Sequence, residues 1–92
     1  MWQLRDFEYH ADIWINTENP DQILINEVFE WILSRMEDPY QGVRREPGFD
    51  NLWYGPVPQA NRQDTTVVAS YWIVEGEHVV RCNSIATLNR PA

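Results

Sequence analysis

Thr65 to Leu88 reads TTVVASYWIV, EGE and HVVRCNSIATL. The first and third segments are rich in β-branched and aromatic residues, which pack well on a pleated, half-buried surface. The short segment Glu75-Gly76-Glu77 between them has the length and composition of a tight turn. We therefore predict a β-hairpin at the centre of a sheet, with one strand over Thr65–Val74 and the other over His78–Leu88.

A further strand is predicted just before this hairpin, over Asn51–Val57. Pro56 and Pro58 lie at its end, and proline cannot donate to a hydrogen-bonded ladder, so this strand is expected at an edge of the sheet. The polar stretch Gln59–Asp64 then connects it to the hairpin.

The first third of the chain has helical spacing instead. Asn19 is a suitable N-cap and Pro20 a suitable first helical residue, which predicts a helix from about Pro20 to Glu37 that ends at Asp38-Pro39. Its apolar residues form one broad face, which needs a sheet or a partner to cover it. They are Ile25, Phe29, Ile32, Leu33 and Met36, with Leu24, Val28 and Trp31 at the sides.

A shorter helix is predicted before it, because Phe7, Ala11 and Trp14 recur at helical spacing. This helix should end near Asn16. Trp2–Arg5 alternates apolar and polar residues like a short first strand. The expected fold is α+β, a single domain over residues 1–92 with two N-terminal helices packed on a small antiparallel β-sheet.

The composition restricts the partners of the chain. Asp and Glu number 14 against seven Arg and no Lys, so the net charge is −7. Such a field repels phosphate backbones at long range and favours basic partners. The longest apolar run, Tyr71–Val74, is far below the roughly 20 residues of a membrane span. We therefore expect a cytoplasmic protein with no membrane partner.

Metal and cofactor chemistry has little support in the sequence. Cys82 is the only cysteine, so no intramolecular disulfide forms, and a small buried apolar role is expected for it. His10 near Asp12 lacks a third ligand at metal spacing. The four glycines do not cluster, which disfavours a nucleotide-binding loop. No metal and no cofactor are expected.

The order of these elements resembles the RelE/ParE superfamily of small toxins from bacterial type II toxin-antitoxin systems. The likeness rests on Trp31-Ile32-Leu33 and Asp38-Pro39 at the end of the second helix and on Asn51-Leu52-Trp53-Tyr54 in the following strand. In the hairpin it rests on Ser70-Tyr71-Trp72-Ile73-Val74 and Val79-Val80-Arg81. The acidic net charge and the absence of a basic residue from Thr66-Val67-Val68-Ala69 depart from that family's pattern.

The resemblance implies a toxin-like protein, either a ribosome-dependent mRNA interferase or a relative whose catalytic residues have decayed. It implies an antitoxin as partner, with the ribosome and mRNA as targets. By comparison of positions, Arg44, Arg45 and Arg62 would bind RNA, and Arg90 follows the last strand. RNA cleavage also needs an acid-base group and a cation, for which His78 and Arg81 are the candidates.

Structural roles compete with each of these assignments. His78 lies beside the tight turn, and strand alternation sends it and Arg81 to opposite faces unless a bulge intervenes. Tyr71 and Trp72 also face opposite ways, so one of them belongs to the core. The alternative function is a non-catalytic acidic module that binds a basic protein. Arg residues converging on one patch would favour the toxin, whereas scattered Arg paired with carboxylates would favour the module.

Overall fold

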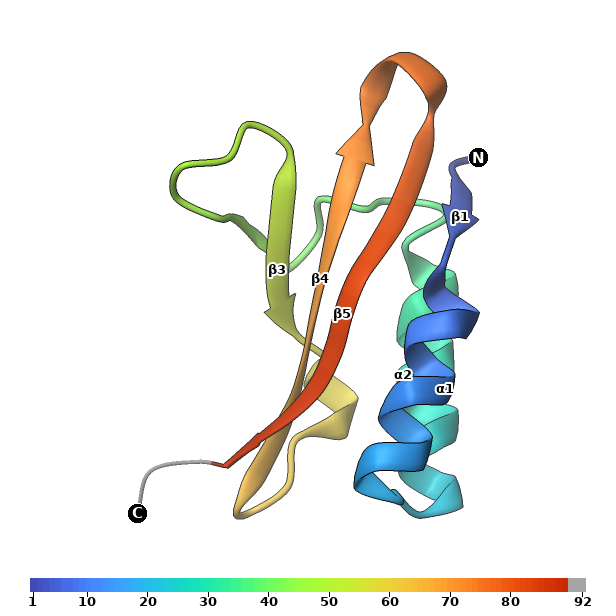
Figure 1. Cartoon of the computed structure of the whole chain (residues 1–92), viewed down its shortest axis with the longest axis vertical. Coiled ribbons are helices and arrows are strands. Elements are labelled where there is room, and N and C mark those ends of the chain that lie inside the picture. Colours follow the sequence, from blue (N-terminus) through green and yellow to red (C-terminus); the bar gives the residue numbers. More distant parts are fainter. Residues whose placement is uncertain (90–92) are drawn as a thin grey trace.

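The computed structural model describes residues 1–89 and forms a two-layer α+β fold (Figure 1). Two helices precede most of the sheet, and two short 3-10 turns, η1 and η2, flank β4. In chain order the elements are β1 (Gln3–Arg5), α1 (Phe7–Glu18), α2 (Gln22–Ser34), β2 (Arg44–Arg45), β3 (Leu52–Pro56), η1 (Pro58–Ala60), β4 (Thr65–Val74), η2 (Glu75–Glu77) and β5 (Val79–Asn89).

The sheet has five strands in the order β1-β5-β4-β3-β2. The predicted hairpin is confirmed, since β4 and β5 pair antiparallel across the middle of the sheet. The prediction of a wholly antiparallel sheet is wrong, because β1 pairs parallel with β5 and places Leu4 beside Val80. Strands joined by a tight turn must be antiparallel, but no local signal sets the direction of a strand that pairs with the far end of the chain. The expected edge position of β3 belongs instead to the two-residue β2.

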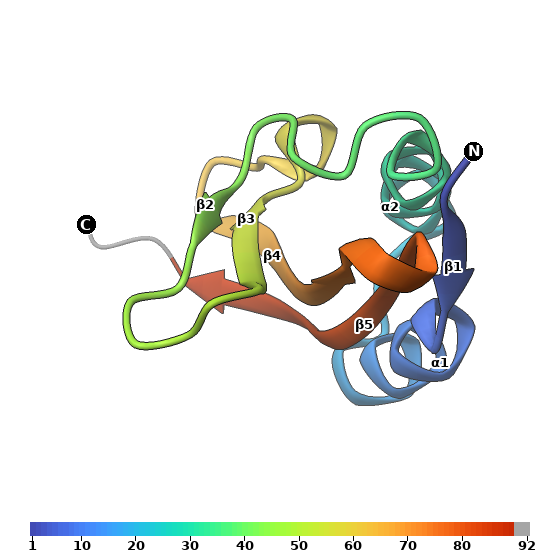
Figure 2. The ribbon, with the colours of Figure 1, turned by 90° about the horizontal axis from the view of Figure 1, so that it is seen from above.

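Both helices lie over the same face of the twisted sheet (Figures 1 and 2). The predicted stripe of α1 is confirmed, as Phe7, Ala11 and Trp14 are buried. From β4, alternate residues enter the same core, namely Val67, Ala69, Tyr71 and Ile73. Trp14 also donates its indole N–H to the Thr87 hydroxyl of β5 at 2.8 Å, which anchors α1 to the sheet.

The α2 helix differs from its prediction at both ends. Asp21 is the N-cap and accepts a hydrogen bond from the Leu24 backbone N–H at 2.8 Å, whereas Asn19 adopts a left-handed conformation that ends α1. The helix ends at Ser34 rather than Glu37. Its buried residues are Leu24, Val28, Trp31 and Ile32, so Leu33, which was expected on the core face, is 60% exposed.

The loop after α2 lies against β3 at a position that only glycine fits. A Cβ atom on Gly55 would lie 2.8 Å from the Gly42 carbonyl oxygen and 2.9 Å from the Val43 side chain. Gly42 itself has φ of +74°, which glycine adopts without strain. This close approach holds the loop beside β3 and places β2 at the sheet edge.

Among residues 1–89, no helix is long and apolar enough to cross a membrane.

Candidate functional site

The sheet face opposite the helices, called the open face below, has no helix over it (Figures 1 and 2). Side chains on this face follow from strand alternation and from the pairing of the strands. One row across the sheet contains Arg44, Tyr54, Ser70 and Ser84. The next row contains Leu52, Trp72, Arg81 and Arg5.

Charge is distributed unevenly over the described residues. The five strands contain Arg5, Arg44, Arg45 and Arg81 and no Asp or Glu. The helices α1 and α2 contain five acidic residues and no Arg. The sheet of this acidic protein is therefore locally cationic, although the whole chain is strongly negative.

Arg5 and Arg81 are direct neighbours across the parallel pair of β1 and β5. Both side chains are exposed, and Arg5 also donates to the side-chain oxygen of Gln3 at 3.2 Å. Like charges directly opposite each other destabilise a sheet unless a counter-ion lies between them. The pair is therefore suited to bind an anion such as a phosphate group.

Arg44 supplies a third cation at the other side of the open face. Strand spacing places β2 about 14 Å from β5, and the two rows lie about 7 Å apart along the strands. The guanidinium group of Arg44 is therefore too far from those of Arg5 and Arg81 for one small ion to contact all three. An extended polyanion is long enough to do so. The aromatic residues Tyr54 and Trp72 lie between them, and both are half-buried.

A polar cluster occupies the centre of the open face. The hydroxyl groups of Ser70 and Ser84 are 2.7 Å apart, and the Asn83 side-chain amide donates to the Ser70 hydroxyl at 3.0 Å. Asn83 reaches this place because the register of β4 and β5 shifts between Ser70 and Tyr71, which leaves it as the extra residue of a bulge. Hydroxyl and amide groups here provide both donors and acceptors.

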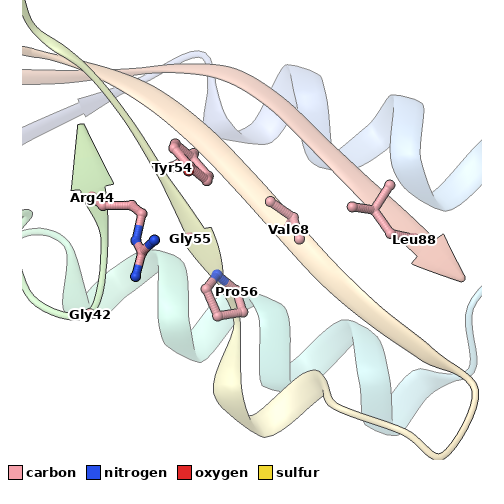
Figure 3. Close-up of a pocket in the computed structure, with 7 residues that line it drawn as sticks. All are labelled: Gly42, Arg44, Tyr54, Gly55, Pro56, Val68 and Leu88. Carbon is pink, nitrogen blue, oxygen red and sulfur yellow. The ribbon is translucent and has the colours of Figure 1, made fainter. Parts of the chain in front are cut away.

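A pocket of about 540 Å³ opens on the same face beside Arg44 (Figure 3). Apolar groups of Tyr54, Pro56, Val68 and Leu88 line it, with the guanidinium group of Arg44 at one side (Figure 3). An aromatic or heteroaromatic ring next to a negative charge matches this combination of groups.

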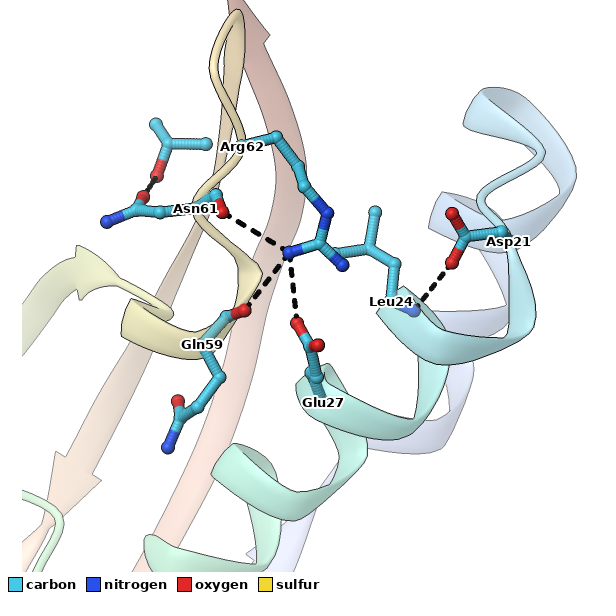
Figure 4. Close-up of polar contacts among 7 residues, drawn as sticks. Asp21, Leu24, Glu27, Gln59, Asn61 and Arg62 are labelled. Carbon is cyan, nitrogen blue, oxygen red and sulfur yellow. Dashed lines mark hydrogen bonds and ion pairs between the residues drawn. The ribbon is translucent and has the colours of Figure 1, made fainter.

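The structure brings some of the candidate residues together and separates others. Arg44 and Arg81 share the open face, with Arg5 as an addition. Arg62 lies on the helix side, where it pairs with Glu27 at 3.2 Å and donates to the carbonyl oxygens of Gln59 and Asn61 (Figure 4). Arg45 pairs with Trp53 and so points away from the face that Arg44 shares with Tyr54.

His78 also lies apart from the open face. It ends the β4–β5 turn in a left-handed conformation, with φ of 58°, and its ring stacks on Trp2 at 3.9 Å between centroids. Trp2 in turn contacts Tyr40 edge to face. His78 comes just before β5, so strand alternation does not set its side relative to Arg81. Arg90 lies outside the described residues.

Two reactive side chains belong to the core. Cys82 is buried as expected, and burial raises the pKa of its thiol to about 12. Tyr71 is completely buried, and burial raises the pKa of its hydroxyl, which donates to the Pro39 carbonyl oxygen and accepts from Arg35 at 3.2 Å. Neither group is accessible to a substrate.

Sequence reasoning missed Arg5, Asn83 and the serine pair. The parallel partner of β1 puts Arg5 beside Arg81, and the bulge puts Asn83 beside Ser70. The only sequence signal for the serines was their alternation with apolar residues in the two hairpin strands.

Within residues 1–89, no group of three or more His, Cys, Asp or Glu side chains is placed to hold a metal ion. Comparison of the chain with protein-family models, curated proteins and solved structures gives no match in any of the three.

Proposed function

We propose that this chain is a toxin-like protein of the type II toxin-antitoxin kind that binds single-stranded RNA on the open face of its sheet. The observation that carries the proposal is the segregation of charge, with Arg5, Arg44 and Arg81 at strand positions of one face and no Asp or Glu in any of the five strands. The resemblance of the sequence to the RelE/ParE superfamily supports the toxin class. That resemblance rests on the order of the predicted helices and strands along the chain.

The side chains of the open face match the parts of a single strand of RNA. Arginine forks bind phosphate groups, and the faces of Tyr54 and Trp72 suit base stacking, which contributes about 1–3 kcal/mol per base. Ser70, Ser84 and Asn83 offer partners for base edges and for the ribose 2′-hydroxyl. Each Arg–phosphate contact releases counterions from the RNA, so binding should be weaker at physiological salt than at low salt. The net charge of −7 should lower the affinity at long range.

Binding without cleavage is the activity that this face supports best. Attack by the 2′-hydroxyl needs a base and a proton donor near the phosphate. Among the described residues, the strand positions of the open face carry no His, Asp or Glu, and His78 stacks on Trp2 instead. This arrangement favours a relative that has lost the cleavage chemistry over an active mRNA interferase.

Fluorescence anisotropy with a labelled single-stranded RNA of mixed sequence tests the proposal. Wild type, Arg44→Ala and Arg81→Ala would be titrated at several salt concentrations, with Arg62→Ala as the control on the helix side. Each phosphate contact that is lost should lower the slope of log K against log salt by about 0.7. Arg62→Ala should leave the slope unchanged.

Equal losses in all three variants, or no salt-dependent binding by the wild type, would overturn the proposal. Incubation of the RNA with the protein, followed by gel analysis, separates binding from cleavage. Induced expression of the wild type and of Arg81→Ala in a bacterial host then tests toxicity. Growth arrest that Arg81→Ala relieves would support a toxin that acts through the open face.

The helix side favours a second function, the binding of a basic protein such as an antitoxin. Large apolar residues are exposed among the acids of α1 and α2, namely Tyr9, Ile13, Ile23 and Leu33. A basic amphipathic helix would match both the charge and the apolar groups. Titration of a labelled Arg- and Leu-rich helical peptide checks this function, and Ile13→Asp should weaken binding while Trp72→Ala should not.

A further inference from the structure

Arg35 is a buried cation without a carboxylate partner. It follows the last residue of α2 and is only 3% exposed. Across residues 1–89, the one ion pair within 4.0 Å joins Arg62 to Glu27, so no carboxylate lies within that distance of the Arg35 guanidinium. Asp38, three residues further along the chain, is exposed, and its carboxylate accepts a hydrogen bond from the Tyr40 backbone N–H.

Neutral groups surround the guanidinium instead. One terminal nitrogen donates to the Gln41 carbonyl oxygen at 2.7 Å and to the Tyr71 hydroxyl at 3.2 Å. The guanidinium also lies 4.5 Å from the centre of the Trp31 ring. A helix C-terminus and an aromatic face both stabilise a cation, but neither supplies the full opposite charge that a desolvated cation requires.

At the other edge of the guanidinium, two nitrogens share one acceptor. Its Nε and its second terminal nitrogen both donate to a single oxygen, the Ser34 hydroxyl, at 3.2 and 3.1 Å. That hydroxyl donates in turn to the Trp31 carbonyl oxygen at 2.5 Å. These two parallel N–H groups are the pair that a carboxylate accepts with its two oxygens.

Ser34 and Arg35 both line a pocket of about 250 Å³. Trp31, Pro56 and Pro58 give it apolar walls, while the amide-bearing residues Gln41 and Gln59 add polar groups. We infer that this pocket binds a small monocarboxylic acid with a compact aromatic or aliphatic tail. Its carboxylate would bind at the Arg35 edge, in place of or beside the Ser34 hydroxyl, and its tail would contact Trp31 and the prolines.

Charge decides between a carboxylate and a phosphate. The desolvation cost of an ion rises steeply with its charge, and the protein already carries −7, so a phosphate dianion would be disfavoured in this pocket. A monocarboxylate neutralises Arg35 without excess charge. This pocket lies on the helix side of the sheet, and the pocket beside Arg44 lies on the open face. Gly42 and Pro56 line both pockets.

Benzoate is the probe for the first experiment, with benzamide as its neutral counterpart and inorganic phosphate as the competing anion. We expect benzoate to raise the midpoint of thermal unfolding saturably and to shift the Trp31 indole and Arg35 Nε–H signals in NMR spectra. Benzamide should bind at least about tenfold more weakly, since it lacks the charge-assisted pair of hydrogen bonds. These measurements use the wild type and do not depend on any variant folding.

A matched pair of variants then tests the position of the carboxylate. Ser34→Asp places a carboxylate of the chain at the Arg35 edge and should abolish the benzoate response, whereas Ser34→Asn should keep it. Equal responses to benzoate and benzamide, tighter binding of phosphate than of benzoate, or an unchanged benzoate response in Ser34→Asp would each overturn the inference. Loss of the response in Arg44→Ala would also overturn it, because the acid would then bind on the open face.

Discussion

The helix layer and the strands of this protein carry charge of opposite sign. All charged residues of α1 and α2 are acidic, whereas all charged residues of the five strands are Arg. The core between them is shared, so both layers contribute to stability, but each outer face is free to acquire its own binding chemistry. The net charge of a small protein therefore describes neither face, and partners should be inferred face by face.

The largest difference in stability should appear between removal of a tryptophan from the core under the helices and removal of one from the open face. Trp14 is 1% exposed and bonded to Thr87, so Trp14→Ala should lower the free energy of unfolding by about 3–5 kcal/mol. Trp72 is half-buried on the open face, and Trp72→Ala should cost about 1 kcal/mol or less while weakening RNA binding. Urea unfolding followed by circular dichroism checks both values, and similar losses would show that the open face belongs to the core.

Gly55→Ala tests the contact that places β2 at the sheet edge. The added methyl group would lie 2.8 Å from the Gly42 carbonyl oxygen, so the loop must move, at a cost of about 1–3 kcal/mol. Gly76→Ala is the matched control, because a Cβ there meets nothing within 4 Å. If Gly55→Ala were as stable as Gly76→Ala, the loop would not be held against β3.

Alkaline pH should lower the free energy of unfolding through Cys82, which lies on the side of the sheet that the helices cover. Its native pKa of about 12 lies above the ordinary 9.0, so the unfolded chain releases this proton first as pH rises. The stability that this burial contributes is complete below pH 9 and is lost between pH 9 and 12. At pH 10.5 the loss should be about 2 kcal/mol relative to pH 8.

Denaturant unfolding of the wild type and of Cys82→Ala at the two pH values isolates this effect, since Tyr71 titrates in both proteins. The pH-dependent loss should be smaller in Cys82→Ala. Identical losses would mean that Cys82 ionises as readily in the native state as in the unfolded chain.

The smallest changes in stability are expected from substitution of Arg62 and Arg81, and the two changes should have opposite signs. Arg62→Ala removes a partly exposed ion pair and should lower stability by less than about 1 kcal/mol. Arg81→Ala removes a like-charged neighbour of Arg5 and should raise stability by a few tenths of a kcal/mol at low salt. Urea unfolding at low and high salt measures both effects. A clear loss of stability in Arg81→Ala would argue against repulsion between Arg5 and Arg81.

Local patterns in the sequence were sufficient for the elements but not for their assembly. The hairpin and the stripe of Phe7, Ala11 and Trp14 were predicted because each depends on neighbours in sequence. The parallel pairing of β1, the bulge at Asn83 and the burial of Arg35 depend on residues far apart in the chain. The positions of the predicted RNA-binding residues could not be told apart for the same reason. Arg44 and Arg62 look alike in sequence, but Arg44 lies on the open face and Arg62 on the helix side.

The pairing of β1 with β5 also constrains how the sheet is completed during synthesis. Gln3 lies beside Val79, so the first strand has no partner until almost the whole described chain has left the ribosome. Until then α1 lacks Thr87 and the rest of β5, so the apolar core under the helices is incomplete. A nascent chain in this state would be vulnerable to proteases and to association with other chains, and folding would depend on the closure of this distant contact.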